Sequence, residues 1–241
     1  MFDRLRYLLL QVRNPDDPMR ANELQSFARA LRTTEDRIRV FDLLAGRLSR
    51  ADFERTDMFL LGGSGHYSVV GEGEWLDRAL DSLRDVHALG RPTFASCWGF
   101  QALARAMGGR VIHDPARAEV GTHPLHLTDA GRDDPVFGPL GNPFHAQMGH
   151  EDSVVELPPG ATRLAFSERA ENQAYRFEGL PIYCTQFHSE LRCGDLWQRV
   201  RTYPEYIANI AGLPVERFGE MIHECPETEE LLPRFVEQVF G

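Results

Sequence analysis

The sequence predicts an α/β fold in which a central, mostly parallel sheet is covered by helices on both faces. In the first half of the chain, short apolar runs alternate with segments of helical periodicity, and this alternation is typical of parallel sheets. From about residue 111 to 187, short strands separated by turn residues prevail and helical periodicity is almost absent. We therefore expect antiparallel strands to extend the sheet in the second half.

The elements of the first half follow from these two patterns. Apolar runs of strand length predict strands at residues 6–12, 38–44, 58–61 and 91–96. Apolar residues spaced three and four positions apart predict helices at residues 21–31, 75–89 and 102–107. Gly90 ends the second of these helices and Gly108-Gly109 ends the third, as glycine commonly does at helix C-termini.

The second half is predicted to be rich in strands until a helical C-terminal part begins. Strands are expected at residues 121–128, 146–157, 163–167, 172–177 and 181–187, and helices at 195–211 and 227–240. With 241 residues and 42% hydrophobic content, the chain can bury one substantial core. We expect one domain over residues 1–241, with a helical extension from about residue 194.

Composition argues against several classes of function. The formal net charge is −10 and all 26 basic residues are arginine, so nucleic acid and anionic membranes are poor candidate partners. Without lysine, no internal Schiff base with pyridoxal phosphate can form. The four cysteines form neither a disulfide framework nor a zinc-binding spacing. We expect neither a metal nor a cofactor.

The sequence favours a cytoplasmic protein. No apolar run approaches the roughly 20 residues that cross a bilayer, and the first residues lack the pattern of a signal peptide. A reducing compartment would keep Cys97 free.

Cys97 is the first candidate catalytic residue, because it lies between the strand at 91–96 and the helix that follows it. The unpaired amides and the dipole at a helix N-terminus favour the thiolate, which is the nucleophilic form of cysteine. Far downstream, the strand at 181–187 ends in His188-Ser189-Glu190. These residues supply a base and a carboxylate that can orient it.

Four features are expected at the carboxyl ends of strands, where open parallel sheets hold their reactive groups. They are the turn at residues 62–65, Cys97, the 188–190 segment and the loop at 14–18. The glycine-rich turn offers unobstructed backbone amides that suit an oxyanion hole. In the loop, Asp16 and Asp17 are expected to be hydrated; the alternative is that they select a cationic or amine-bearing substrate.

Each signal also has an ordinary interpretation. A cysteine after a strand is often a small buried apolar residue, and a Gly-Gly-x-Gly turn serves any tight bend. The His188-x-Glu190 pair is also compatible with a solvated strand end or with two metal ligands. The catalytic interpretation is favoured because independent features occur in one order and are all predicted at one edge of the sheet.

Together, Cys97-Trp98-Gly99-Phe100-Gln101, the turn at 62–65 and Gln186-Phe187-His188-Ser189-Glu190 resemble the class I, or triad-type, glutamine amidotransferases. The segment at 149–154 with Leu157-Pro158 resembles the stretch that these domains carry before their last strands. The resemblance covers about residues 6–192 and is closest to stand-alone members often called GMP synthase-like. It implies a three-layer α/β/α, flavodoxin-like fold.

The resemblance also implies a role for each motif residue. Cys97 would attack the side-chain amide of glutamine and form a γ-glutamyl thioester, with His188 as the base and Glu190 orienting it. Further residues match the family's other site positions: the backbone amides of Gly63 and Trp98 as oxyanion donors, Gly65 and Gln101 at the α-amino and α-carboxylate end of the substrate, and His150 in a segment whose main chain lines the pocket.

Three functions remain open at this point. The chain lacks a phosphate-binding loop and the Ser-Gly-Gly-x-Asp-Ser signature of an ATP pyrophosphatase domain, so it cannot complete GMP synthesis alone. It is either a glutaminase that passes ammonia to a separate synthetase, or a free-standing hydrolase of γ-glutamyl amides or peptides. The third interpretation is a binding module on the same fold. The oligomeric state does not follow from the sequence.

Overall fold

The computed structural model describes residues 4–206, 210 and 215–241. Its strands are β1 (Tyr7–Gln11), β2 (Ile38–Asp42), β3 (Met58–Leu61), β4 (Thr93–Ser96), β5 (Arg110–His113), β6 (Glu119–Leu127), β7 (Phe144–His150), β8 (Asp152–Glu156), β9 (Ala161–Phe166), β10 (Ala174–Phe177) and β11 (Ile182–Thr185). The α-helices are α1 (Met19–Ala30), α2 (Arg50–Glu54), α3 (Glu74–Ala88), α4 (Trp98–Ala106), α5 (Asp129–Asp133), α6 (Cys193–Thr202), α7 (Pro204–Tyr206), α8 (Pro226–Glu229) and α9 (Leu231–Phe240).

Nine strands form one sheet in the order β2-β1-β3-β4-β11-β10-β9-β6-β7. The first five strands pair in parallel, and the last four continue the sheet with antiparallel pairs. The strand β4 lies between β3 and β11, so segments that are distant in the sequence end at the same edge. The predicted fold class is confirmed.

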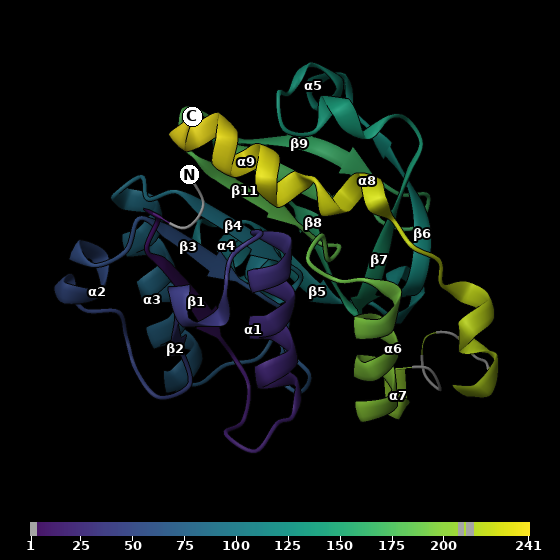
Figure 1. Ribbon diagram of the computed structural model, residues 1–241, viewed down its shortest axis with the longest axis horizontal. Coiled ribbons are helices and arrows are strands. Elements are labelled where there is room, and N and C mark those ends of the chain that lie inside the picture. Colours follow the sequence, from purple (N-terminus) through teal and green to yellow (C-terminus); the bar gives the residue numbers. More distant parts are fainter. Residues whose placement is uncertain (1–3, 207–209, 211–214) are drawn as a thin grey trace.

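Helices cover both faces of the sheet and make three layers (Figure 1). In β1, successive residues alternate between two apolar clusters: Leu9 belongs to the cluster with α1 and α9, and Leu8 to the one with α3 and α4. This alternation reflects the two-residue period of a strand. The helix stripe of Leu76, Leu80 and Leu83 is part of the second cluster.

One predicted strand was wrong in its extent. Residues 146–157 form two strands, β7 and β8, because the chain bends at Glu151 and the two halves find different partners. β7 pairs with β6 in the large sheet, whereas β8 pairs with β5 in a separate two-stranded sheet. Both halves are short and no glycine or proline separates them, so the sequence pattern alone did not reveal the bend.

The C-terminal helices are also interrupted. The helix predicted at 195–211 begins at Cys193, ends at Thr202 and is followed by α7; Pro204 cannot donate the backbone bond that would continue it. Part of the predicted range, residues 207–209 and 211, lies outside the described residues. The helix predicted at 227–240 is divided into α8 and α9, and Pro233 is tolerated in α9 because it lies in the first turn.

Several elements were missing from the sequence prediction or were placed too late. The helices α2 and α5 and the strand β5 have only four or five residues each, which is too short for a period to be recognised. The helix α4 begins at Trp98, four residues before its predicted start. This earlier start matters because it places Cys97 directly at the helix N-terminus.

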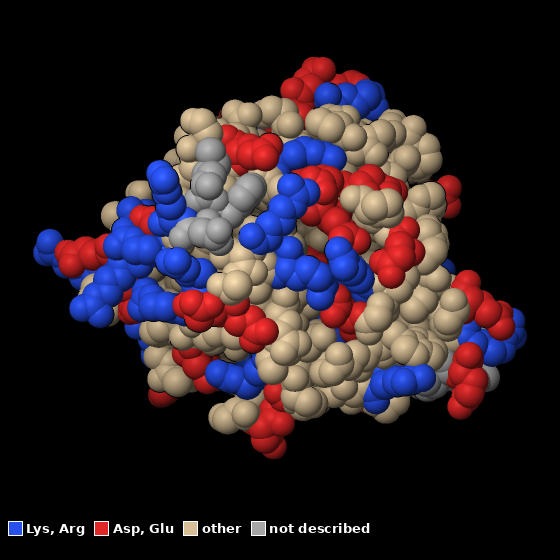
Figure 2. All heavy atoms as spheres, viewed as in Figure 1, with Lys and Arg blue, Asp and Glu red and all other residues tan. Residues whose placement is uncertain are grey.

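The surface is mixed in charge. Figure 2 shows carboxylates and arginine side chains interspersed over one face of the molecule, and surface ion pairs include Arg32–Glu230 and Arg192–Glu229. Across the described part of the chain, no helix combines the length and the apolar character that a membrane crossing requires.

We expect Phe235→Ala to lower the free energy of unfolding by about 3–5 kcal/mol, because it leaves a cavity in the layer between α9 and the sheet. Phe235 is fully buried and its ring contacts the rings of Phe94 and Tyr183. Urea unfolding followed by circular dichroism measures the change. The control, Val40→Ala, alters a side chain that is 40% exposed and should change stability by less than about 0.5 kcal/mol. Equal effects of the two substitutions would contradict this placement of α9.

Candidate active site

Cys97 occupies a sharp turn between β4 and α4. Its backbone has φ +51° and ψ −104°, a left-handed conformation that costs a non-glycine residue free energy and is common at functional sites. The turn is held on both sides, since the Cys97 amide donates to the Thr185 carbonyl at 2.8 Å and the Gln101 amide donates to the Cys97 carbonyl at 3.1 Å. The strained turn therefore places Cys97 at the helix N-terminus, as the sequence predicted, and its sulfur lies 3.6 Å from the Gly149 carbonyl oxygen.

His188 and Glu190 follow β11, the parallel neighbour of β4. The Nδ1 atom of His188 lies 2.6 Å from Oε1 of Glu190, and the other carboxylate oxygen accepts a hydrogen bond from Ser96 Oγ at 3.0 Å. The His188 amide donates to the Gln147 carbonyl at 2.9 Å, which fixes the backbone. The bond at Nδ1 leaves Nε2 as the atom that can exchange a proton with a substrate.

Gly63 shows how closely Cys97 and His188 approach each other. A Cβ atom placed on Gly63 would lie 3.0 Å from His188 Cε1 and 3.7 Å from Cys97 Cβ. A side chain at position 63 would therefore press against the imidazole, and the turn after β3 runs close to both groups. The two groups also line one small cavity, so the structure brings the predicted nucleophile and base together.

The site is buried and strongly charged. Burial disfavours the imidazolium, but the charges of Glu190 and Cys97 outweigh it and raise the pKa of His188 from 6.5 to about 9. Burial also works against the Glu190 carboxylate, yet His188 and Arg199 hold the pKa of Glu190 below its ordinary value. The stability that the raised His188 pKa contributes is therefore fully present below pH 6.5 and is lost as the pH rises through about 9.

An open pocket of about 250 Å³ lies on one side of Cys97. Its lining is mostly polar and comprises Ser64, Gly65, His66, Tyr67, Ser68, Cys97, Trp98, Gln101, His113, Gly149, His150, Glu151, Asp152 and Glu205. We call this the outer pocket. Three residues that the sequence singled out for substrate binding, Gly65, Gln101 and His150, are all part of it.

Hydrogen bonds fix the side chains of Gln101 and His150. Gln101 Nε2 donates to the Asp152 carbonyl at 3.0 Å and to the Gln186 side chain at 3.1 Å. The ring nitrogens of His150 lie 3.0 Å from the Asp152 carbonyl and 3.2 Å from the Glu119 carboxylate. Because both ring nitrogens have protein partners, His150 forms a rigid wall of the pocket.

A second, smaller cavity lies on the His188 side of Cys97. It has a volume of about 40 Å³ and is lined by Arg13, Gly63, Ser64, Cys97, Val120, Gly149, His188, Leu196, Arg199, Val200 and Tyr203. We call this the inner cavity. A volume of this size admits molecules as small as water or ammonia.

Two predictions about the loop at 14–18 are corrected by the structure. Asp17 is not hydrated, because its side chain is 3% exposed and accepts hydrogen bonds from Tyr203 at 2.6 Å and from Arg13 at 3.3 Å. Nor does it reach the outer pocket to select a substrate. Of the two carboxylates, only Asp16 is exposed. The sequence could not show the arginine that holds Asp17 in the interior.

Two arginines beside the site, Arg13 and Arg199, were not predicted from the sequence, although they are only 2% and 7% exposed. A signal for the second was present: Leu196, Val200 and Tyr203 form the buried face of α6 and its C-terminal end, and Arg199 falls within that stripe. An arginine on an apolar face is an exception that points to a buried partner or a function. Among the described residues, no group of three or more potential ligands is arranged for a metal ion.

Comparison with known families gives one match over most of the chain. The family model described as "Glutamine amidotransferase class-I" matches residues 24–199, a range that includes Cys97, His188 and Glu190. It leaves out the C-terminal elements from α7 onward.

Curated relatives carry the name glutamine-hydrolyzing GMP synthase, either whole or as one subunit of it. The subunit from Thermococcus kodakarensis is 35% identical over 100 residues, which cover 42% of this chain and 51% of that protein. The subunit from Sulfurisphaera tokodaii is 32% identical over 136 residues, 56% of this chain and 68% of that protein. The GMP synthase of Prochlorococcus marinus is 34% identical over 105 residues, and the match spans 43% of this chain but only 19% of that protein.

Solved structures share the fold along nearly the whole chain. A glutamine amidotransferase from Thermotoga maritima superposes with a TM-score of 0.74 at 20% identity and covers 97% of both chains. One from Methylobacillus flagellatus has a TM-score of 0.70 at 19% identity, over 97% of this chain and 95% of that one. These likenesses extend the common fold beyond the segment that the family model matches.

We expect His188→Gln to slow the alkylation of Cys97 by iodoacetamide at pH 7 by about tenfold or more, since the variant loses the imidazolium that stabilises the thiolate. Mass spectrometry of the Cys97 peptide measures the rate. His126→Gln, which changes a histidine stacked on Phe166 in the antiparallel half of the sheet, serves as the matched control and should react like the native protein. Equal rates in the native protein and in His188→Gln would show that the imidazole does not act on the sulfur.

Proposed function

Because the chain belongs to the class-I glutamine amidotransferase family, we propose that it hydrolyses the side-chain amide of glutamine through a thioester on Cys97. The observation that carries the proposal is the meeting of Cys97, His188 and Gly63 at one point. A nucleophile, a base bound to a carboxylate, and a close backbone turn are the parts that acyl transfer requires.

In the first step, the Cys97 thiolate attacks the amide carbon of glutamine, and a carbon–sulfur bond forms. We assign the stabilisation of the oxyanion that develops to the Trp98 amide, at the start of α4, and to the Gly63 amide. Each such donor is worth roughly 3 kcal/mol in the transition state. His188 then gives its proton to the amide nitrogen, the carbon–nitrogen bond breaks, and ammonia leaves.

In the second step, water hydrolyses the γ-glutamyl thioester. His188, now neutral, takes a proton from the water as its oxygen attacks the carbonyl carbon, and the carbon–sulfur bond breaks to release glutamate and the Cys97 thiolate. Glu190 keeps the proton at Nδ1 through its 2.6 Å contact, so the imidazole remains in the tautomer that serves both steps.

The outer pocket is suited to the amino-acid end of the substrate. Its lining combines Gln101, the turn residue Gly65 and the carboxylates of Asp152 and Glu205. Carboxylates are the natural partners of an α-ammonium group. We assign glutamine to this pocket with its side-chain amide directed at Cys97.

The inner cavity favours glutamine over larger γ-glutamyl compounds. His188 lines this cavity, so the group that receives its proton departs on this side of the thioester. About 40 Å³ of this cavity is accessible to a water-sized molecule, which is enough for ammonia. This size argues against the alternative function, a free-standing γ-glutamyl peptidase.

A separate synthetase is the acceptor that we propose for the ammonia. The support comes from the relatives in Thermococcus kodakarensis and Sulfurisphaera tokodaii, whose names describe them as single subunits of glutamine-hydrolyzing GMP synthases. In that arrangement, glutamine hydrolysis by the isolated chain is slow and rises when the synthetase binds.

We expect the purified protein to release ammonia from glutamine and Cys97→Ala to abolish the release, because no thioester can form without the sulfur. A coupled glutamate dehydrogenase assay measures ammonia. Cys184→Ala is the matched control, since this cysteine is buried in β11 away from both cavities. Retained turnover in Cys97→Ala would refute the role of the nucleophile. A native protein that neither releases ammonia nor labels at Cys97 with a glutamine-like electrophile would leave the binding-module interpretation.

A series of γ-glutamyl amides tests the size of the leaving group. We expect kcat/KM to fall by about tenfold or more when the leaving group changes from ammonia to methylamine, and further for an amino acid, because the small inner cavity accommodates a larger leaving group less well. Glutamate release measured for each compound gives the ratio. A γ-glutamyl dipeptide hydrolysed faster than glutamine would reverse the assignment and favour the peptidase.

A further inference from the structure

Arg199 is buried directly behind the candidate catalytic residues. It lies on α6, and its Nη1 atom is 3.5 Å from Nδ1 of His188. Its Nε atom makes a long contact of 3.4 Å with the Asn22 side chain on α1. Since Nδ1 of His188 donates to Glu190, the arginine gains no acceptor from the imidazole.

The partners of Arg199 do not explain its burial. Within the described residues, no carboxylate oxygen lies within 4.0 Å of its guanidinium nitrogens, and Nη2 is buried without a hydrogen-bond partner. Arg13, by contrast, forms ion pairs with Asp17 and Glu23, both at 3.3 Å. Burying a charged group without a paired carboxylate is unfavourable. A purely structural arginine is therefore expected to resemble Arg13, and Arg199 does not.

The charges that face Arg199 come from every element packed against it. They are Arg13 after β1 together with its ion-pair partner Asp17, Glu23 on α1, Cys97 before α4, and His188 and Glu190 after β11. Arg29 and Asp195 form an ion pair with each other nearer the surface of the protein. When Cys97 is a thiolate and His188 is charged, three cations including Arg199 face four anions. Without Arg199, two cations would face the same four anions.

We propose that Arg199 is a positioning residue for the reaction proposed above, on which this inference rests: its buried positive charge stabilises the Cys97 thiolate and keeps Glu190 ionised beside His188. Burial and Arg13 lower the pKa of Arg199, while the charges of Glu23, Glu190 and Cys97 act in the opposite direction. The interaction with Glu190 is reciprocal, because Arg199 lowers the pKa of that carboxyl.

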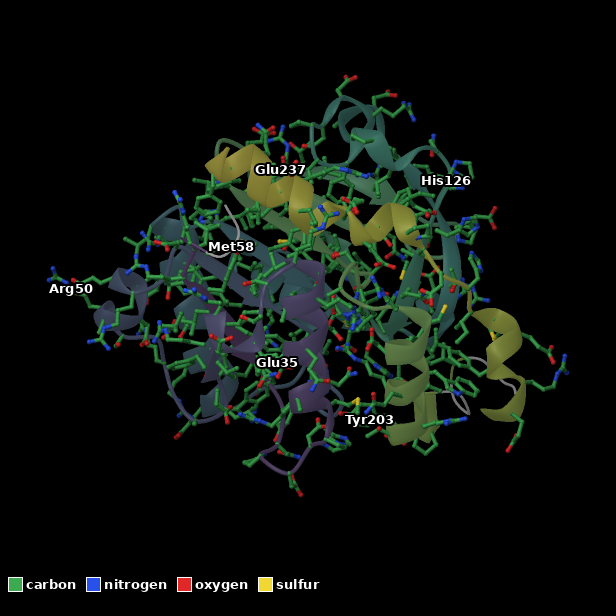
Figure 3. The ribbon with its side chains drawn as sticks, in the orientation of Figure 1. Glu35, Arg50, Met58, His126, Tyr203 and Glu237 are labelled. Atoms are coloured by element: carbon green, nitrogen blue, oxygen red, sulfur yellow. The ribbon has the colours of Figure 1, made fainter. Side chains whose placement is uncertain are left out.

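Tyr203 holds α6, and with it Arg199, in this place. Its hydroxyl donates to Asp17 at 2.6 Å and accepts from Arg13 at 2.9 Å, so the end of α6 is tied to the segment that leads into α1 (Figure 3). A Cβ atom placed on Gly65 would collide with the Tyr203 ring. The positive charge of Arg199 therefore rests on one rigid support. This support consists of α6, the turn after β3 and the ion pair between Arg13 and Asp17.

The test is the pH dependence of Cys97 alkylation by iodoacetamide, with the labelled peptide identified by mass spectrometry. At low pH the alkylation rate rises as Cys97 loses its proton, and we call this part of the profile the acid limb. We expect Arg199→Gln to move the acid limb up by about one pH unit, because the variant lacks the positive charge that stabilises the thiolate. Alkylation on that limb would then be about tenfold slower. Arg199→Lys keeps the positive charge, so its acid limb should lie close to that of the native protein. Arg201→Gln removes an exposed arginine from the same helix and should leave the profile unchanged.

Several outcomes would overturn the proposal. A native acid limb in folded Arg199→Gln would show that the charge does not act on the sulfur. A shift of the same size in Arg199→Lys would show that the shape of the side chain matters rather than its charge. If circular dichroism shows that Arg199→Gln does not fold, Arg199→Lys decides alone: an unmoved limb supports the proposal and a moved one contradicts it.

The two proposals fail separately. Alkylation is measured without a substrate, so a native protein that releases no ammonia would refute the hydrolytic function while the Arg199 profiles still report on the thiolate. Conversely, normal ammonia release together with an unshifted Arg199→Gln profile would refute only the role of Arg199.

Discussion

The parallel pairing of β4 with β11 is the contact on which the candidate active site depends. It aligns Ser96 with Thr185, so the residues that follow the two strands emerge at one edge of the sheet. Backbone and side-chain bonds then complete the junction, from the Cys97 amide to the Thr185 carbonyl and from Ser96 to Glu190. A shift of this register by one residue would turn every side chain to the opposite face and separate the sulfur from the imidazole.

Burial of charge is the second constraint on the site. Five charged or titratable side chains near the site are buried: Arg13, Asp17, Glu23, His188 and Arg199. Burying such groups is unfavourable unless their charges balance. The pairs around Arg13 meet this condition through direct contacts. Arg199 has no such carboxylate partner, and in our proposal its charge is balanced by Glu190 and the Cys97 thiolate, which connects the packing of α6 to the chemistry proposed for Cys97.

The sequence patterns predicted most of the longer helices and strands and their order along the chain. The strands around Leu9, Leu60 and Phe94 were predicted because apolar runs between turn residues leave few alternatives. Cys97 and His188 were singled out as candidates because each directly follows a predicted strand. The patterns failed where the structure depended on contacts between distant segments: the bend at Glu151 between β7 and β8 arises because the two halves pair with different strands.

The sequence by itself determined the order of the elements, the strand-to-helix corner at Cys97 and the glycine turn, because these depend on local periodicity and local backbone freedom. Only the tertiary structure decided that Asp17 is buried, that Arg199 stands behind His188 and that the inner cavity is small. The physical reason is that the environment of a charge or a cavity is set by side chains from several distant segments. No single stretch of the chain contains that information.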